Sequence, residues 1–160
     1  MTDIREARPE DDAALVAIDA ATWTSDVSPA PTPVAPVTFF DGRRAPADVL
    51  VAEIDGEVVG YAGLHNAIPL ASHAHVLEIN GLAVAPAAAG RGVGRHLVEA
   101  VVAEATRRGA RKVTLRVLGT NAVARRLYAR CGFVEEGVLL EEFLLDGRYV
   151  DDVLMARRPG

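Results

Sequence analysis

Two Asp-Gly dipeptides constrain the fold of this chain more than any other feature. Asp55-Gly56 lies between the runs VLVAEI and EVVGYAGL, and Asp146-Gly147 lies between VLLEEFLL and RYVDDVLMA. Two-residue type I′ turns prefer Asp-Gly, because both central residues of such a turn have positive φ. Runs rich in β-branched residues on either side of a turn are typical of strands. The sequence therefore predicts two β-hairpins, one in the first half of the chain and one at its end.

Strand-like and helix-like segments alternate around these hairpins. A short first strand, DIREARP, precedes a helix that we expect from about Glu10 to Ala21, with Pro9 and acidic residues at its front. Further along, HVLEINGLAVAP and RKVTLRVL predict strands, and RHLVEAVVAEATRRG and TNAVARRLYARCG predict helices. We therefore expect a mixed α/β (α+β) fold with a βαβ-like centre and a mostly antiparallel sheet of about seven strands flanked by helices.

The length of 160 residues suits a single domain, and we take 1–160 as one unit. Residues 25–36 hold four of the nine prolines. Proline is excluded from helix interiors and from central strands. We therefore interpret residues 25–36 as an extended loop within the domain, since too few residues precede them to form a second one.

Charge and cysteine content exclude several classes of protein. The formal net charge of −5 offers no broad basic surface for a phosphate backbone, so we expect no nucleic-acid partner. The charged N-terminus does not resemble a signal peptide, and no apolar run is long enough for a membrane span. The lone Cys131 permits no internal disulfide, which favours a reducing, cytoplasmic location. No histidine or cysteine spacing indicates a metal site.

Three glycines at alternate positions, Gly90, Gly92 and Gly94, separate a predicted strand from a predicted helix. They are explained either as a flexible connection or as an anion site, in which backbone N–H groups at a helix N-terminus bind phosphate. A nucleotide P-loop is excluded because Arg95 and His96 follow Gly94 where Lys-Ser/Thr is required. The dinucleotide pattern G-x-G-x-x-G is not met either.

Two motifs together resemble the GNAT superfamily of acetyl-CoA-dependent N-acyltransferases. The strand end LAVAP followed by Ala89-Gly90-Arg91-Gly92-Val93-Gly94 is similar to the family's phosphate motif, and NAVARRLYARCGF, residues 121–133, matches a second family motif. The resemblance implies a GNAT-like fold and acetyl-CoA as co-substrate. One departure is Ala89, which stands where the family carries Arg or Gln. The residues that the resemblance assigns to coenzyme binding are Leu82, Ala83, Val84, Ala89, Gly90, Arg91, Gly92, Val93, Gly94, Arg95, Asn121 and Tyr128.

The resemblance also implies catalytic roles. Tyr128 matches the family tyrosine that gives a proton to the coenzyme thiolate, whereas in isolation it reads as a packing residue of an amphipathic helix. Asn121 matches a coenzyme contact and also suits a helix N-cap. Glu78 is our candidate general base, because it stands on the strand before the glycine motif where some family members carry a catalytic glutamate. Alternation along that strand places Glu78, Asn80, Leu82 and Val84 on one face. A salt-bridged strand glutamate is the alternative, and the histidines His65, His73 and His75 are weaker candidates.

The acceptor is less constrained by the sequence. The family builds its acceptor pocket from the first helix, the following loop and the last hairpin. The closing hairpin here resembles those of relatives that act on protein N-termini and on small amines or amino acids, which implies a small-molecule amine or a peptide N-terminus as partner. Pocket candidates here are Trp23, Asp26, Phe39, Phe40, Asp151 and Asp152. Family habit also implies a possible homodimer. The alternative function is an acetyl-CoA-binding sensor or interaction module without catalysis. Cys131 reads as a packing residue, since no histidine–acid pair accompanies it.

Overall fold

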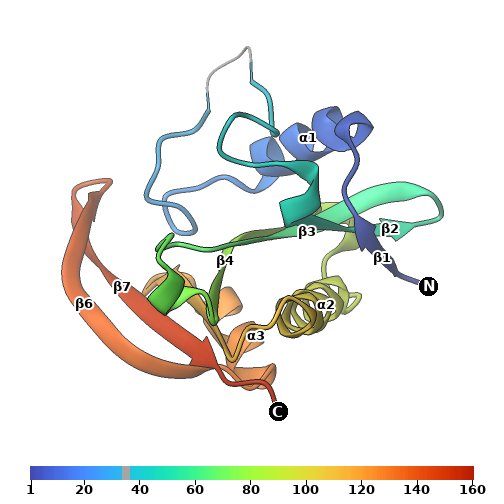
Figure 1. The fold of residues 1–160 in the computed structure, drawn as a ribbon. Helices are drawn as coiled ribbons and strands as arrows, with labels where there is room; N and C mark the ends of the chain where they lie inside the picture. The colour runs from blue at the N-terminus through green and yellow to red at the C-terminus, as the bar shows by residue number, and fades with distance from the viewer. Residues whose placement is uncertain (34–36) are drawn as a thin grey trace.

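The computed structural model describes residues 1–33 and 37–160 and contains a seven-stranded mixed sheet (Figure 1). The strand order is β1-β2-β3-β4-β5-β7-β6, and among the described pairs only β4 and β5 are parallel. The fold class predicted from the sequence is confirmed. The strands are β1 (Asp3–Glu6), β2 (Val49–Ile54), β3 (Glu57–His65), β4 (Val76–Val84), β5 (Lys112–Leu118), β6 (Val134–Leu145) and β7 (Arg148–Arg157). The helices are α1 (Asp12–Thr22), α2 (Val93–Arg107) and α3 (Ala122–Arg130), with short 3-10 turns at 9–11, 46–48, 71–73 and 86–88.

Both predicted hairpins are present. Asp55 and Gly56 have φ values of 52° and 80°, and Asp146 and Gly147 have values of 50° and 74°. These left-handed pairs match the turn that Asp-Gly favours. The first helix begins at Asp12, later than predicted, because Pro9–Asp11 form a 3-10 turn closed by the Asp11 carboxylate, which accepts the Arg8 N–H at 2.7 Å.

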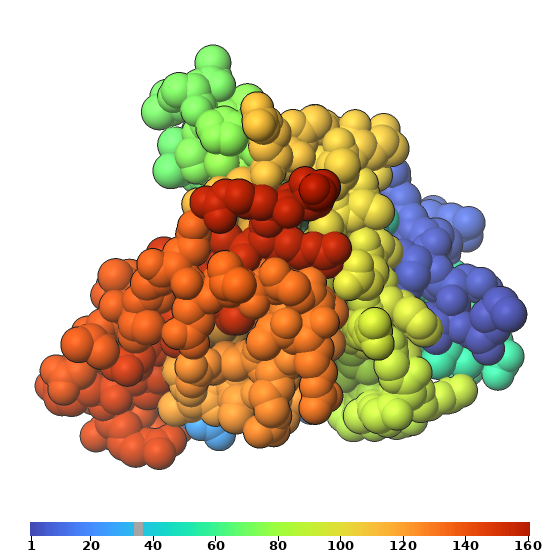
Figure 2. Space-filling model, turned by 90° about the horizontal axis from the view of Figure 1, so that it is seen from below, coloured from blue at the N-terminus to red at the C-terminus, as the bar shows by residue number. Residues whose placement is uncertain are grey.

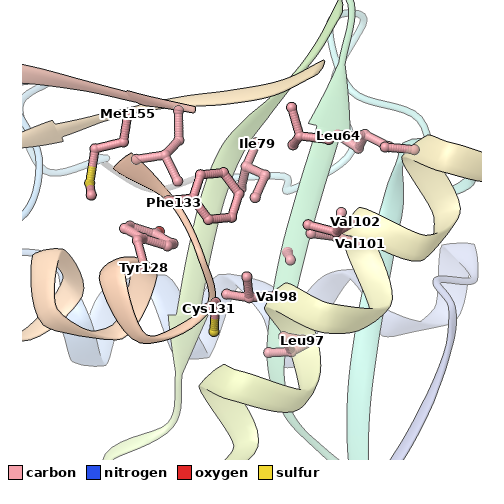
Figure 3. Packing of buried hydrophobic residues seen from close by; sticks show 14 of the residues in the cluster. Leu64, Ile79, Leu97, Val98, Val101, Val102, Tyr128, Cys131, Phe133 and Met155 are labelled. Atoms are coloured by element: carbon pink, nitrogen blue, oxygen red, sulfur yellow. The ribbon is translucent and has the colours of Figure 1, made fainter. Parts of the chain in front are cut away.

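The helices cover both faces of the sheet. In Figure 1, α1 lies on one side of the strands, and α2 and α3 lie on the other. The larger core packs α2 and α3 against the sheet, and the fully buried residues of α2, such as Leu97, Val98 and Val101, lie at helical spacing along it. Figure 3 shows this cluster, in which Tyr128 of α3 lies beside Phe133. A smaller core packs Leu15 and Ile18 of α1 against β2 and β3.

The end of β7 contacts both α2 and the C-terminal end of α3. Figure 2 shows the red C-terminal segment lying between yellow α2 and the orange segment that holds β6. Arg157 at the end of β7 donates to the Cys131 carbonyl at 2.8 Å and to the Glu99 carboxylate at 3.2 Å. The last strand therefore fixes the end of α3 relative to α2.

A β-bulge interrupts β4 in its middle. Leu64 pairs with Ile79 and Ala62 pairs with Leu82, so Asn80 and Gly81 together oppose Gly63. Side chains beyond a bulge change faces, because one extra residue shifts the alternation. Leu82 consequently packs into the same core as Ile79. The predicted common face for Glu78, Asn80, Leu82 and Val84 is therefore wrong.

The proline-rich segment forms no helix or strand over residues 25–33, as predicted, and its last residues, 34–36, lie outside the described residues. Among the described residues, no helix is long and apolar enough to cross a membrane.

Candidate functional site

A cleft opens where β4 and β5 separate. The two strands pair in parallel from Val76–Lys112 to Ile79–Leu115, and beyond Ile79 no pairing joins them. The cleft has a volume of about 1260 Å³ and is lined by β4 beyond the bulge, by the glycine turn and by α3. The β4 segment Leu82–Val84 stays paired to β3, so its other edge faces this cleft without a partner strand. An extended ligand is recognised by such a free edge through main-chain hydrogen bonds.

The glycine turn presents unpaired N–H groups at the start of α2. The first backbone bond of the helix runs from the His96 N–H to the Gly92 carbonyl at 3.1 Å. The N–H groups of residues 93–95 therefore have no backbone partner among the described residues, and no side chain caps the helix. Free N–H groups together with the positive end of a helix dipole form an anion site.

The three glycines serve two different purposes. Gly90 and Gly92 have φ values of 77° and 79°, a left-handed conformation that glycine adopts without strain. Gly94 lies inside α2, where a Cβ would stand 3.1 Å from Leu127 Cδ2 of α3. The first two glycines shape the turn, and the third allows α2 and α3 to approach closely.

Asn121 and Tyr128 bring α3 to the same cleft. The Asn121 side chain accepts the Ala124 N–H at 3.2 Å and caps the helix, and Asn121 also lines the cleft. Tyr128 lies two turns further along, is 7% exposed and packs edge-on against Phe133 (Figure 3). Burial raises the pKa of Tyr128 to about 12, so its hydroxyl is protonated at neutral pH. That hydroxyl has no protein partner among the described residues and is not sealed from the cleft.

Most of the predicted coenzyme-binding residues line this cleft. Of the set assigned from the sequence, Arg91 alone does not line the cleft, and Arg91 is exposed. Arg95 does line it, on the first turn of α2. Cys131 is buried in the core, as its packing interpretation predicts.

Glu78 lies outside the cleft. Its carboxylate is 2.8 Å from His65 Nε2, and it lines an adjacent cavity of about 1420 Å³ together with His73 and His75. Arg116 lines both spaces. Glu78 does not line the cleft that contains Tyr128. Its role as general base therefore stays a prediction. Among the described residues, no group of three His, Cys, Asp or Glu side chains is arranged to hold a metal ion.

The opposite end of the cleft is formed by α1 and the loop that follows it. Trp23 and Asp26, two of the candidates for an acceptor pocket, line this end. The other pocket candidates do not line it. Phe39 is buried beside Tyr61, Phe40 packs at its edge, Asp151 accepts the Glu141 N–H, and buried Asp152 binds Arg116 at 2.6 Å.

Sequence reasoning missed three residues at this end, Asp19, Tyr61 and Arg44. The Tyr61 hydroxyl donates to Asp19 Oδ1 at 2.5 Å, and the Arg44 guanidinium lies over the Phe39 ring, 4.3 Å from its centroid. Asp19, Tyr61 and Arg44 all line the cleft. One signal was available in the sequence: Asp19 follows Leu15 by four residues, which places a carboxylate on the apolar stripe of α1.

Several known proteins resemble this chain in sequence and in fold. A sequence model described as the acetyltransferase (GNAT) family matches residues 13–133. Phosphinothricin N-acetyltransferase of Alcaligenes faecalis is 38% identical over 68% of this chain, and spermidine N(1)-acetyltransferase of Vibrio cholerae is 44% identical over 42% of it. The aligned parts span 55% and 40% of those two proteins, about half their length. A structure from Salmonella typhimurium with its cofactor acetyl-CoA is 25% identical, with a TM-score of 0.77 and coverage of 99% of this chain and 94% of that one.

The family match begins on α1 and ends at Phe133, so it includes the glycine turn, Asn121 and Tyr128. It spans well over half of the chain. This chain therefore belongs to the acetyltransferase (GNAT) family.

Proposed function

We propose that this chain is an N-acetyltransferase that moves an acetyl group from acetyl-CoA to a primary amine of a small molecule or a peptide N-terminus by direct attack. One observation carries the proposal: free N–H groups at the start of α2 and the Tyr128 hydroxyl open onto a single cleft. The relatives that act on amines, by their names, support the reaction class.

The chain offers groups that suit two parts of acetyl-CoA, the pyrophosphate and the pantetheine arm. The N–H groups of residues 93–95 suit the pyrophosphate, and Arg95 adds positive charge beside them. The free edge of Leu82–Val84 suits the amide-bearing pantetheine arm, which carries its own hydrogen-bonding groups. Bound there, acetyl-CoA supplies an acetyl group activated as a thioester.

Two side chains are proposed to move protons. The amine nitrogen forms a bond to the acetyl carbonyl carbon, the carbon–sulfur bond breaks, and Tyr128 gives its proton to the departing sulfur. Its raised pKa keeps that proton available at neutral pH. Glu78 is proposed to take up a proton from the amine through water, with His65 holding its carboxylate. An amine that enters as an ammonium ion loses two protons, one of which replaces the proton that Tyr128 gave to sulfur, so the reaction releases one proton overall.

A sensor without catalysis is the second candidate. Ala89 favours it, because a side chain that the family uses at the phosphate turn is missing. Melting experiments with acetyl-CoA, run beside a thiol-release assay, separate the two: a sensor is stabilised by acetyl-CoA and releases no thiol with any amine.

The test is a thiol-release screen with acetyl-CoA and four kinds of acceptor: phosphinothricin, spermidine, the standard L-amino acids and an alanine-terminated peptide. We expect release with at least one acceptor and an acetylated product by mass spectrometry. If acetyl-CoA stabilises the protein but no acceptor causes thiol release, the sensor function would be supported in place of the enzyme.

Two expectations from the sequence stay predictions. A cytoplasmic location rests on the lone cysteine, and a homodimer rests on family habit. The β6 edge strand exposes Val134, Leu140 and Leu144, each at least 60% exposed, which is a surface suited to self-association. Analytical ultracentrifugation would measure the oligomeric state.

A further inference from the structure

Asp19 presents a partly satisfied carboxylate to the acceptor end of the cleft. It lies one turn before the end of α1, and its Oδ1 accepts the Tyr61 hydroxyl at 2.5 Å. No second hydrogen bond to its side chain is made within the described residues. Asp19 is only partly buried and lines the cleft, so its carboxylate is accessible to a ligand there.

The position of this carboxylate is electrostatically unfavourable for the free protein. Burial raises the pKa of Asp19 above its ordinary value, while the Tyr61 hydroxyl and the Arg44 charge oppose that rise. The last turn of a helix is also the negative end of its dipole, and the last turn of α1 contains no basic residue. Charged groups in such unfavourable positions are typical of functional sites, where local stability is given up for binding or catalysis.

The protein provides no contacting cation for Asp19 within the described residues. Arg44 is the nearby positive charge, but it stacks on Phe39 and lies 5.9 Å from the Tyr61 ring centroid, with no ion pair to Asp19. Asp26, the other acid at this end, is exposed and already lies 3.6 Å from Arg148. Asp19 is therefore the carboxylate at this end that lacks a cation in contact.

The Asp19–Tyr61 pair also lies beside the reactive part of the cleft. The Tyr61 hydroxyl is 3.7 Å from the place where a Cβ would stand on Gly81, in the β4 bulge. Beyond that bulge β4 separates from β5, and Tyr128 lines the same opening. A cation held by Asp19 would thus lie between α1 and the strand edge proposed for the coenzyme.

We propose that Asp19 binds the ammonium group of the acceptor and that Tyr61 positions its carboxylate for this contact. The inference rests on the proposed function, because it specifies how that site recognises its amine. It selects acceptors whose nitrogen enters the cleft as a cation, and it assigns Asp19 to binding rather than to proton transfer.

The test measures amine binding separately from turnover. Calorimetry at saturating coenzyme A, which has no acetyl group to transfer, would titrate the whole chain with phosphinothricin, spermidine and the alanine-terminated peptide. We expect Asp19→Asn to weaken the tightest of these about tenfold to a hundredfold, since a hydrogen bond to a charged group is lost. Tyr61→Phe should weaken it less, and both variants should keep the wild-type affinity for coenzyme A.

Asp48→Asn is the matched control, because Asp48 pairs with Arg108 away from the cleft and its removal changes the net charge equally. Equal amine affinity in wild type and Asp19→Asn would overturn the inference, as would the absence of any amine binding to the wild type. Loss of coenzyme affinity in Asp19→Asn would also overturn it, since that indicates a structural role. Amine binding that depends on Asp19, without thiol release in the screen, would support the inference and overturn the proposed enzyme instead.

Discussion

The Tyr128 ring packs edge-on against Phe133, with ring centroids 5.9 Å apart and planes at 61°. Phe133 follows the end of α3, and its backbone N–H also donates to the Tyr128 carbonyl at 3.0 Å. This double contact fixes the tyrosine on a short helix and leaves its hydroxyl at the cleft. A proton donor held in this way loses little conformational freedom when a substrate binds.

Tyr128→Phe should lower the turnover number about a hundredfold, because it removes a positioned proton donor. The affinity for acetyl-CoA should stay unchanged, since the ring remains in place. Thiol release and calorimetry measure the two quantities, and Tyr149→Phe, at an exposed position on β7, is the control. Burial raises the pKa of Tyr128 to about 12, so its deprotonation should produce no loss of activity between neutral pH and about pH 10. Unchanged turnover in Tyr128→Phe would exclude it as the donor.

Gly92→Ala should weaken acetyl-CoA binding, because Gly92 has a φ of 79° at the start of α2 and orients the free N–H groups. Gly109→Ala is a matched control at the other end of the helix. Gly109 has a φ of 93°, and neither glycine has an atom within 4 Å of an added Cβ. Each variant should lose about 1 kcal/mol of stability from backbone strain. Only Gly92→Ala should raise the dissociation constant of acetyl-CoA, and equal affinities would argue against a phosphate site.

Ala89→Arg should strengthen acetyl-CoA binding several-fold, by restoring a cationic side chain that lines the cleft beside the turn. Ala87→Arg adds the same charge two residues earlier, on a residue that does not line the cleft. Calorimetry on both variants at moderate and high salt would show whether the gain is local. A similar gain in acetyl-CoA affinity in both variants would mean that the added positive charge acts through long-range attraction and not through a contact at position 89.

Glu78→Gln should lower the turnover number about tenfold if the proton of the amine passes to this carboxylate. The variant keeps a hydrogen-bonding group for His65, so its fold should be preserved. The matched control is Glu57→Gln at the exposed start of β3. Wild-type turnover in Glu78→Gln would exclude Glu78, in agreement with its place in the adjacent cavity.

Asp11→Asn should destabilise the fold by about 1–3 kcal/mol at neutral pH, because Asp11 is buried and accepts two hydrogen bonds from Arg5. The Arg5 guanidinium, more than any other group, lowers the pKa of Asp11 below its ordinary value. A lowered folded-state pKa gives stability above the unfolded pKa that is lost as pH falls through the folded value. The difference between wild type and variant in urea titrations should therefore shrink below about pH 4. Asp3→Asn, at the exposed start of β1, should show little difference at any pH.

Local rules predicted the elements of this fold because each element carries its own signal. Asp55-Gly56 and Asp146-Gly147 adopt the left-handed turn that their residue types favour. The start of α1 was less predictable. The Asp11 carboxylate accepts a hydrogen bond from the Arg8 N–H and closes a 3-10 turn over Pro9–Asp11, so the α-helix begins only after Asp11.

The candidate site was predictable only where a motif runs along the chain. The glycine turn and NAVARRLYARCGF are continuous segments, and the structure brings them to one cleft. The β4 bulge had no such signal, because it depends on the register with β3. The pairing of Asp19 with Tyr61 joins residues 42 positions apart and arises from the packing of α1 on β3.

The β4 bulge has a consequence for how this chain can vary. One strand carries Glu78 and Asn80 on its polar face, and then Leu82 and Val84 in the core with α2. Removing one of Asn80 and Gly81 would restore one-to-one pairing with β3 and leave Leu82 two positions after Ile79, on the same core-facing side, so only the bend that the bulge puts into β4 would be lost. Adding one residue there would instead turn Leu82 and Val84 out of the core, so β4 can be shortened at the bulge without displacing its core residues but cannot be lengthened.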